Sequence, residues 1–332
     1  MITIIEGFGQ TALVFLSSAA ACIALGPAAI RALRKAQFVQ PFRHEDCPSL
    51  ASVQIGKEGT PTMGGLLVLG ASTAVAAIAG GLESRVGMLV CACVLGFGAL
   101  GLLDDLLKFR GPNGRGLRTL PKLLITILLA FLLAWGLFTA TGGVGRIDWP
   151  GRSYGVSLGL LWIPFAALVF VGTSHAVNLT DGMDGLAAGC LFITLSAFLL
   201  IRARAGTDPV VNIWCAALAG ACAGFLWFNS FPASVFLGDV GAMGLGAALA
   251  AISLLHQSPF WLMWIGAIFV VEALSVMAQV AAYKWLHRRI FRVAPLHHHF
   301  QVAGVSEPKL IARFWLVNVA LVIIGVALWE RV

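Results

Sequence analysis

The sequence predicts an all-α polytopic membrane protein with about ten transmembrane helices. Three observations predict this class: 59% of the 332 residues are hydrophobic, only 11% are charged, and long apolar runs recur along the whole chain. A run of about 20 apolar residues is what a helix needs to cross a bilayer. We therefore expect one integral membrane domain over residues 1–332, embedded in the lipid bilayer.

The apolar runs follow one another with short connections. The expected spans are 9–30, 62–81, 86–107, 120–141, 157–175, 184–204, 211–228, 235–255, 260–285 and 312–330. The first run is long enough to cross the membrane and is followed by Arg31, Arg34 and Lys35. A basic flank of this kind is typical of a retained first helix rather than of a cleaved signal peptide.

Charge divides the connections into two sets. Of the 22 lysines and arginines, sixteen fall on one side of the ten-span layout and six on the other. Cytoplasmic loops carry the excess of basic residues, so we expect the first side to be cytoplasmic and both termini to be outside. The same rule accounts for the net charge of +7, which we therefore do not interpret as a nucleic-acid-binding surface.

The seven cysteines indicate neither a disulfide framework nor a zinc site. All but Cys47 lie in apolar runs, and no two of them form a CxxC pair. They are expected to be small buried hydrophobic residues. On the outer side, the glycine-rich segment 141–156 around Trp149 favours a short hairpin.

Acidic residues at the ends of apolar runs are the most informative feature for function. They form three clusters: Asp104 with Asp105, Asp181 with Asp184, and Asp239 alone. An ionisable residue kept at membrane depth costs free energy, and its default interpretation is functional. All three clusters fall on the cytoplasmic side of the layout. They predict a bound cation and, with it, a phosphorylated substrate.

Asp104 and Asp105 are adjacent at the end of the third expected span. Neighbouring residues on a helix point about 100° apart, so we expect the two carboxylates to have different tasks. One would face the reacting atoms while the other orients a metal or a lysine such as Lys108. The alternative is an interfacial charge pair that only marks the membrane edge.

The segment Asn178–Gly185 joins the fifth and sixth spans and carries four short oxygen-bearing side chains and two glycines. Asp181 and Asp184 are spaced so that one helical turn would place them on one face. A tight turn is the alternative, because Asn, Asp and Gly suit turn dihedrals. A turn needs fewer such residues, so we favour a functional site.

A glycine-rich segment, Gly59–Gly65, opens the second span. Its glycines let a ligand approach the backbone, Thr62 can cap the following helix, and a helix N-terminus attracts anions. Lys57, just upstream, is a candidate partner for a phosphate or a carbonyl group. An ordinary capped helix start is an equally good interpretation.

Asn229 and the segment Phe236–Asp239 form another polar site at the start of the eighth span. An acid near a helix start is favoured by the helix dipole whether or not it binds a ligand. Phe236 beside a polar loop can stack on a base, although packing is the commoner use of such a ring.

The last cytoplasmic loop carries His297, His298 and His299. Three adjacent histidines cannot all ligate one metal ion in regular backbone, so hydrogen bonds to phosphate are favoured over zinc. A solvated loop is the alternative. Glu272, in the middle of the ninth span, is interpreted as a hydrogen-bonded helix-packing acid rather than part of an ion path, because no second intramembrane acid is available as a relay.

Together these segments resemble the phospho-N-acetylmuramoyl-pentapeptide-transferase (translocase I) family of the polyprenyl-phosphate hexose-1-phosphate transferase superfamily. The resembling segments occur in order over nearly the whole chain: Gly59–Gly65, Asp104 with Asp105, Asn178–Gly185, Phe236–Asp239 and Pro295–Phe300. Thr-Pro-Thr-Met-Gly-Gly and the triple histidine indicate the muramoyl-pentapeptide branch. The chain departs from the family pattern within residues 45–54 and at Gln301, where an acid is common.

The resemblance implies transfer of phospho-MurNAc-pentapeptide from UDP-MurNAc-pentapeptide to undecaprenyl phosphate, which makes lipid I and releases UMP. It implies Mg²⁺ as the metal, a role in peptidoglycan synthesis, and a location in the bacterial cytoplasmic (inner) membrane. It also leaves room for a homodimer.

By motif position, the resemblance implies a task for each candidate residue. Asp239 is the first magnesium ligand and Asp181 the second. Asp104 is the base or nucleophile, and Asp105 supports it. The substrate-binding set is Lys57, Thr62, Asn178, Asp181, Asp184, Asn229, Phe236, His297 and His299, with Phe236 stacking on uracil. His298 is counted with the catalytic residues.

Two mechanisms are open at this stage. Asp104 either deprotonates the lipid phosphate for direct attack or forms a phospho-enzyme, and we favour direct attack because the lipid phosphate is already mostly ionised near neutral pH. Two other functions are also weighed. One is a related UDP-N-acetylhexosamine-1-phosphate transferase. The other is a secondary transporter, whose ion site would lie near the membrane midplane rather than at its cytoplasmic edge.

Overall fold

The computed structural model describes residues 2–39, 57, 59–110, 116–149, 155–202 and 208–329. The helices are α1 (Ile2–Lys35), α3 (Gly65–Ile78), α4 (Arg85–Arg110), α5 (Thr119–Ala140), α6 (Trp162–Thr180), α7 (Leu186–Arg202), α8 (Pro209–Asn229), α9 (Gly238–Leu255), α10 (Pro259–Ile265), α11 (Ala267–Leu286), α12 (Leu296–Val302) and α13 (Glu307–Trp329). A 3-10 helix, η1 (Gly159–Leu161), precedes α6, and the strands are β1 (Arg146–Asp148) and β2 (Gly155–Ser157).

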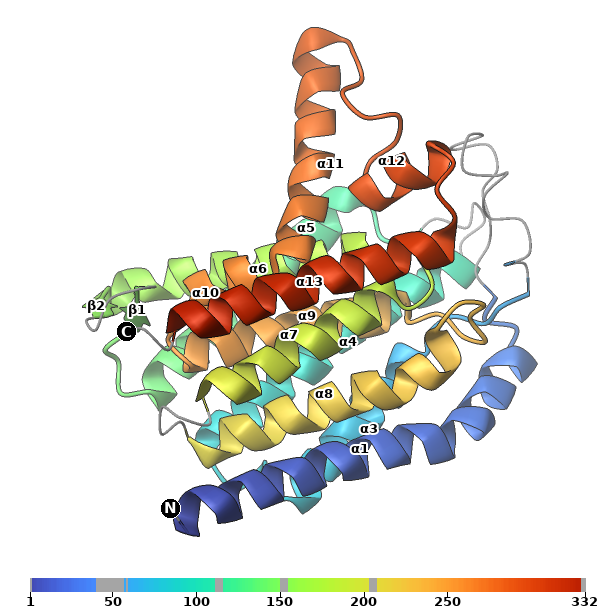
Figure 1. The fold of residues 1–332 in the computed structure, drawn as a ribbon. Helices are drawn as coiled ribbons and strands as arrows, with labels where there is room; N and C mark the ends of the chain where they lie inside the picture. Colours follow the sequence, from blue (N-terminus) through green and yellow to red (C-terminus); the bar gives the residue numbers. More distant parts are fainter. Residues whose placement is uncertain are drawn as a thin grey trace.

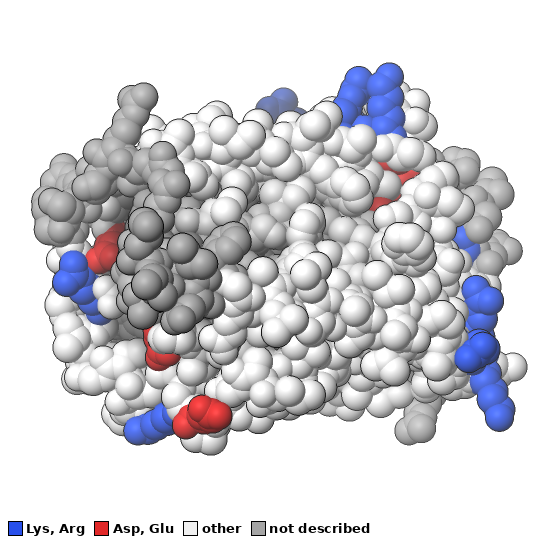
Figure 2. Space-filling model, turned by 60° about the horizontal axis from the view of Figure 1, so that its bottom comes forward, with Lys and Arg blue, Asp and Glu red and all other residues white. Residues whose placement is uncertain are grey.

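Every expected span contains a helix, which confirms an all-α polytopic membrane protein. Among the described residues, eight helices are long and apolar enough to cross a membrane: α1, α4, α5, α6 with η1, α8, α9, α11 and α13. The other two expected spans are the shorter apolar helices α3 and α7. Figure 2 shows charged side chains toward the two ends of one face, with a broad uncharged band between them.

The ninth expected span, 260–285, is wrong as a single helix. The chain breaks at Gly266 between α10 and α11. A Cβ at Gly266 would lie 2.8 Å from the Leu262 carbonyl oxygen, so the close turn requires glycine. Beyond the break, α11 leaves the direction of the bundle and projects from it (Figure 1).

Helix α9 is the best-buried candidate span, with 83% of its apolar window buried inside the protein. Small residues allow its neighbours to approach closely. A Cβ at Gly65 of α3 would lie 2.2 Å from the Gly241 Cα, and one at Gly101 of α4 would lie 2.2 Å from the Asp239 carbonyl oxygen. The first turn of α9 is therefore clamped between α3 and α4, which fixes the position of Asp239.

The two ends of the bundle differ in character. At one end β1 and β2 pair antiparallel, with Ile147 opposite Val156, which confirms the predicted hairpin. At the other end the last turns of α4 and α6 meet the first turns of α9 and α13 (Figure 1). The histidine segment at this end is the short helix α12, so its prediction as a loop is wrong.

Candidate active site

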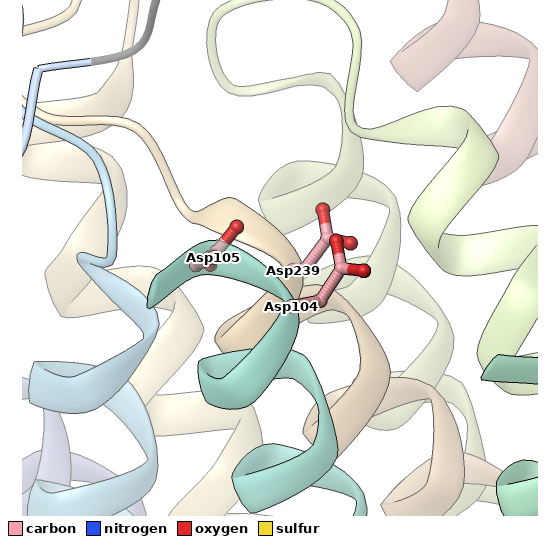
Figure 3. A group of neighbouring side chains, drawn as sticks. All are labelled: Asp104, Asp105 and Asp239. Carbon is pink, nitrogen blue, oxygen red and sulfur yellow. The ribbon is translucent and has the colours of Figure 1, made fainter. Parts of the chain in front are cut away.

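Three carboxylates meet where α4 ends and α9 begins. One oxygen each from Asp104, Asp105 and Asp239 lie within 4.8 Å of one another (Figure 3). Asp104 and Asp105 are almost fully buried, with 3% and 2% of their surface exposed. Three carboxylates this close repel one another unless cations lie between them.

Two lysines supply that positive charge. Lys108 Nζ lies 2.9 Å from Asp104, 3.1 Å from Asp105 and 2.9 Å from Asp239. Lys122, from the first turn of α5, lies 2.6 Å from Asp239 and 3.4 Å from Asp104. We call these five residues the acid–lysine cluster. Lys108 contacts both members of the acidic pair, and Lys122 contacts Asp104 as well.

Backbone hydrogen bonds join two of the predicted motifs beside this cluster. Phe236 N–H donates to the Pro61 carbonyl, and Gly64 N–H donates to the Phe236 carbonyl, both at 2.8 Å. Asp105 Oδ2 accepts from Val240 N–H at 3.1 Å and so stabilises the first turn of α9. Gly238, with φ of +74°, lets the chain enter α9 at this point.

Thr62 is buried in this junction but does not cap α3. The N-cap residue is Gly64, which makes no side-chain hydrogen bond, so the capping prediction is wrong. A Cβ at Gly238 would lie 2.8 Å from Thr62 Oγ1 and 2.9 Å from Asp105 Oδ2. The hydroxyl and the carboxylate therefore flank the glycine at the start of α9.

Asp181 lies in the turn after α6, half-buried and close to the acid–lysine cluster. Burial first, and then the charges of Asp239 and Asp105, raise the pKa of Asp181 to about 8. The backbone N–H of Gly238 opposes this shift by donating to the carboxylate. Asn178 lies nearly one turn earlier, on the last turn of α6, and is also half-buried.

A second network of charges lies at the same end of the bundle. Lys57 Nζ lies 2.7 Å from Asp184 and 2.5 Å from Glu307. Asp184 Oδ2 accepts from Ala233 N–H at 2.9 Å, and Asp184 N–H donates to Glu307 Oε1 at 2.9 Å. We call Lys57, Asp184 and Glu307 the lysine frame, because its acids bind backbone as well as the lysine.

Asn229 and Phe236 adjoin the lysine frame. Asn229 accepts from Gly185 N–H at 3.1 Å and donates to the Val235 carbonyl at 2.9 Å. Lys57 Nζ lies 5.9 Å from the centre of the Phe236 ring. The structure therefore brings together Lys57, Asp184, Asn229 and Phe236, the residues expected to hold the nucleotide.

The three histidines of α12 have separate surroundings. His297 is fully buried, and its Nδ1 lies 3.1 Å from Glu272, so Glu272 is hydrogen-bonded as expected. His298 Nδ1 lies 2.7 Å from Gln301. Burial and the neighbouring His297 lower the pKa of His298 to about 3. His299 Nδ1 accepts from Arg292 N–H at 3.1 Å, so this residue serves its local segment.

Two residues of the site were missed as functional residues in the sequence. Lys122 and Glu307 each stand at the start of an apolar run. Charges at the ends of apolar runs commonly set membrane topology, so the sequence does not distinguish these two residues from other flanking charges. The departures from the family pattern within residues 45–54 lie outside the described residues.

Two family models match parts of the chain. The family model described as glycosyl transferase family 4 matches residues 87–257, and the model for signature 1 of phospho-N-acetylmuramoyl-pentapeptide-transferase matches residues 57–69. These ranges include the acid–lysine cluster and Lys57, but not His297–His299.

Curated relatives match along nearly the full chain. A protein of Pelobacter propionicus is 38% identical over 96% of this chain and 92% of its own length. One of Geobacter sp. strain M21 is 39% identical over 91% and 88%, and one of Heliobacterium modesticaldum is 40% identical over 95% and 96%. Each carries the name phospho-N-acetylmuramoyl-pentapeptide-transferase.

Proposed function

Because the chain belongs to the phospho-N-acetylmuramoyl-pentapeptide-transferase family, we propose that its acid–lysine cluster is the centre of phosphosugar transfer. The enzyme makes lipid I in peptidoglycan biosynthesis. Its substrates are UDP-MurNAc-pentapeptide and undecaprenyl phosphate, and UMP is released. The observation that supports this placement is the convergence of three carboxylates and two lysines at one end of the bundle.

The carboxylates of this cluster fit a magnesium ion. Lys108 Nζ contacts Asp104, Asp105 and Asp239 at once, which is a position where a cation is stabilised. Mg²⁺ prefers carboxylate and phosphate oxygens. Asp239 would be the principal ligand, with the acidic pair beside it and Asp181 in support. When bound, the ion would neutralise charge on the two phosphates.

Asp104 is better suited to orient the reacting groups than to form a covalent intermediate. Its Oδ1 accepts from Leu117 N–H at 2.8 Å, and its Oδ2 pairs with Lys108 at 2.9 Å and Lys122 at 3.4 Å. A carboxylate whose two oxygens both accept from donors is a weaker nucleophile. The contacts therefore favour direct attack by the lipid phosphate over a phospho-enzyme.

The lysine frame is proposed to hold the nucleotide. Lys57, Asp184 and Asn229 offer polar contacts to the uridine, and the half-buried Phe236 ring lies beside them for stacking on uracil. Asn178 and Thr62 line the approach to the diphosphate. His298 is neutral near pH 7 because of its lowered pKa, so it would hydrogen-bond to the phosphates or the sugar without adding charge.

The end of the bundle that carries the site is proposed to face the cytoplasm, where soluble nucleotide sugars are found. The basic residues gather at this side of the expected layout, and this assignment leaves both termini outside. The enzyme would then lie in the bacterial inner membrane. A transporter site near the midplane does not fit acids that lie within the last two turns of α4 and in the first turn of α9.

A transfer assay tests the proposal. Purified protein is given radiolabelled UDP-MurNAc-pentapeptide and undecaprenyl phosphate, with Mg²⁺ or with a chelator. Labelled lipid and UMP should form only with Mg²⁺. A protein that instead used only UDP-N-acetylhexosamine, or that transferred equally well in the chelator, would contradict it.

A further inference from the structure

Glu272 is an acid in the second turn of α11 with no exposed surface. Its partner is His297 of α12, which is equally buried. The backbone N–H of His297 donates to the two carboxylate oxygens at 3.2 and 3.4 Å, and ring Nδ1 lies 3.1 Å from Oε2. The acid therefore fixes both the start of α12 and the orientation of the imidazole ring.

The pairing determines which ring nitrogen carries the proton. An ionised carboxylate only accepts hydrogen bonds, so Nδ1 of His297 is the donor. In the neutral ring, Nε2 then has a free lone pair on the opposite side. Within the described part of the chain, Nε2 is buried and has no hydrogen-bond partner.

The Nε2 side of the ring lies against the turn that carries Asp181 and Asp184. A Cβ at Gly182 would lie only 2.3 Å from His297 Nε2 and 3.1 Å from His298 Nε2. The two imidazole rings lie together, with their centres 4.1 Å apart. Gly182 is thus the residue that lets the turn rest directly on the histidine rings.

From these contacts we propose that Glu272 is a positioning residue for the transfer reaction, acting through His297 on the turn Asp181–Gly185. The Glu272 carboxylate holds the His297 ring, and the ring supports Gly182. The turn then keeps Asp181 beside Asp239 and Asp184 against Lys57. The inference rests on the proposed function of those two aspartates. It gives α11, which projects from the bundle, a direct part in shaping the site.

A positioning role differs from simple packing in what it changes. If Glu272 only packed α11, its loss would lower the stability of the protein and kcat together. If it positions the turn, kcat should fall in protein that remains folded, since a misplacement of about 1 Å can reduce a rate on the order of 100-fold. Glu272 and Gly182 should then act in one chain of contacts, and their effects should not multiply.

The test compares Glu272→Ala, Glu272→Gln, Gly182→Ala and the double variant Glu272→Ala/Gly182→Ala in the full-length enzyme. Ser275→Ala is the matched control, because its buried hydroxyl donates to the Glu272 backbone carbonyl and not to His297. For each variant, kcat, KM for UDP-MurNAc-pentapeptide and the melting temperature are measured in detergent.

Glu272→Ala should lower kcat on the order of 100-fold, with KM and melting temperature changed far less. Glu272→Gln should recover most of the loss, because one amide oxygen at the Oε2 position can accept from both Nδ1–H and the backbone N–H. The double variant should be no slower than the slower single variant, and Ser275→Ala should stay within about twofold of the wild type. Wild-type kcat in Glu272→Ala, or single effects that multiply, would overturn the inference.

A second readout does not depend on turnover. In ¹⁵N-histidine NMR spectra, the signal lost in His297→Asn should report a protonated Nδ1 and an unprotonated Nε2, and Glu272→Gln should shift it. If that signal shows a protonated Nε2 alone, the positioning inference fails. If the tautomer is as expected but wild-type protein transfers nothing, the proposed function fails instead.

Discussion

The acid–lysine cluster and the lysine frame lie at the same end of the bundle and use the same residue types, but they are built differently. In the cluster all three acids share lysines, Asp104 and Asp105 each accept one backbone N–H as well, and Lys108 and Asp239 keep 31% and 17% of their side-chain surface exposed. In the frame Asp184 and Glu307 are 3% and 6% exposed and also bind backbone N–H groups. In the first arrangement a metal ion can replace a lysine beside the carboxylates, and the lysine can then bind a phosphate. The second arrangement holds loops in place.

The difference teaches that the lysines an acid shares with other acids indicate its task better than its burial does. A carboxylate that binds backbone N–H groups shapes the chain around it, as Asp105 does for the start of α9. A carboxylate that shares an ammonium group with two other acids is available for an ion. On this view the acid–lysine cluster carries out the reaction, and the lysine frame mainly holds the structure around it.

The largest effect is expected in the acid–lysine cluster. Asp104→Asn and Asp239→Ala should each lower the transfer rate on the order of 10³-fold or more, because each removes charge from the centre where the phosphates react. The rate of labelled lipid formation measures this. Glu83→Gln, an exposed acid in the turn after α3, is the control and should leave the rate unchanged. Full activity of Asp104→Asn would remove that residue from the centre.

The next effect concerns Lys122, whose ammonium lies 2.6 Å from Asp239. Lys122→Met should slow transfer about 100-fold, since it leaves the carboxylates with excess negative charge where anionic substrates must bind. Lys122→Arg keeps the charge and should retain more activity than Lys122→Met. Equal loss in the two variants would show that charge is not what Lys122 contributes.

A smaller effect on catalysis is expected in the lysine frame. Glu307→Gln weakens the contacts to Lys57 and to Asp184 N–H, and this should destabilise the protein by about 1–3 kcal/mol. UMP binding should weaken about tenfold while kcat changes less. Titration calorimetry with UMP, together with thermal unfolding, measures both quantities. If kcat falls as far as in Asp239→Ala, the division between the two regions is wrong.

The smallest effect concerns His298, whose Gln301 partner also donates to Glu307 of the lysine frame. Its folded pKa of about 3 lies below the ordinary histidine value of 6.5. The unfolded chain therefore binds more protons below pH 6.5, and stability should fall as pH falls toward 3. Between pH 7 and 5, His298→Asn should lose about 1–2 kcal/mol less stability than the wild type. Identical pH dependence of unfolding in the two proteins would contradict this.

The apolar runs predicted the fold well because helix length and hydropathy follow directly from the bilayer. They missed the break at Gly266, since the run 260–285 is apolar on both sides and hydropathy carries no information on direction. They also missed α12, because a short polar helix after Pro295 has no apolar signal of its own.

The site was predicted unevenly for a physical reason. Asp104, Asp105 and Asp239 stood out because acids are costly at membrane depth. Lys122 and Glu307 did not, because charges at helix ends occur with or without a partner. Their importance depends on which residues the fold brings opposite them, and a single sequence does not report those contacts.

Direct binding of a divalent cation tests the central claim, that the acid–lysine cluster and not the lysine frame is the transfer centre. Mn²⁺ is titrated into purified wild-type, Asp239→Asn and Glu307→Gln proteins and followed by electron paramagnetic resonance, with Mg²⁺ as competitor. The wild type and Glu307→Gln should each bind one Mn²⁺ ion that Mg²⁺ displaces, and Asp239→Asn should bind it far more weakly. Wild-type binding by Asp239→Asn, with loss of binding in Glu307→Gln, would contradict the account.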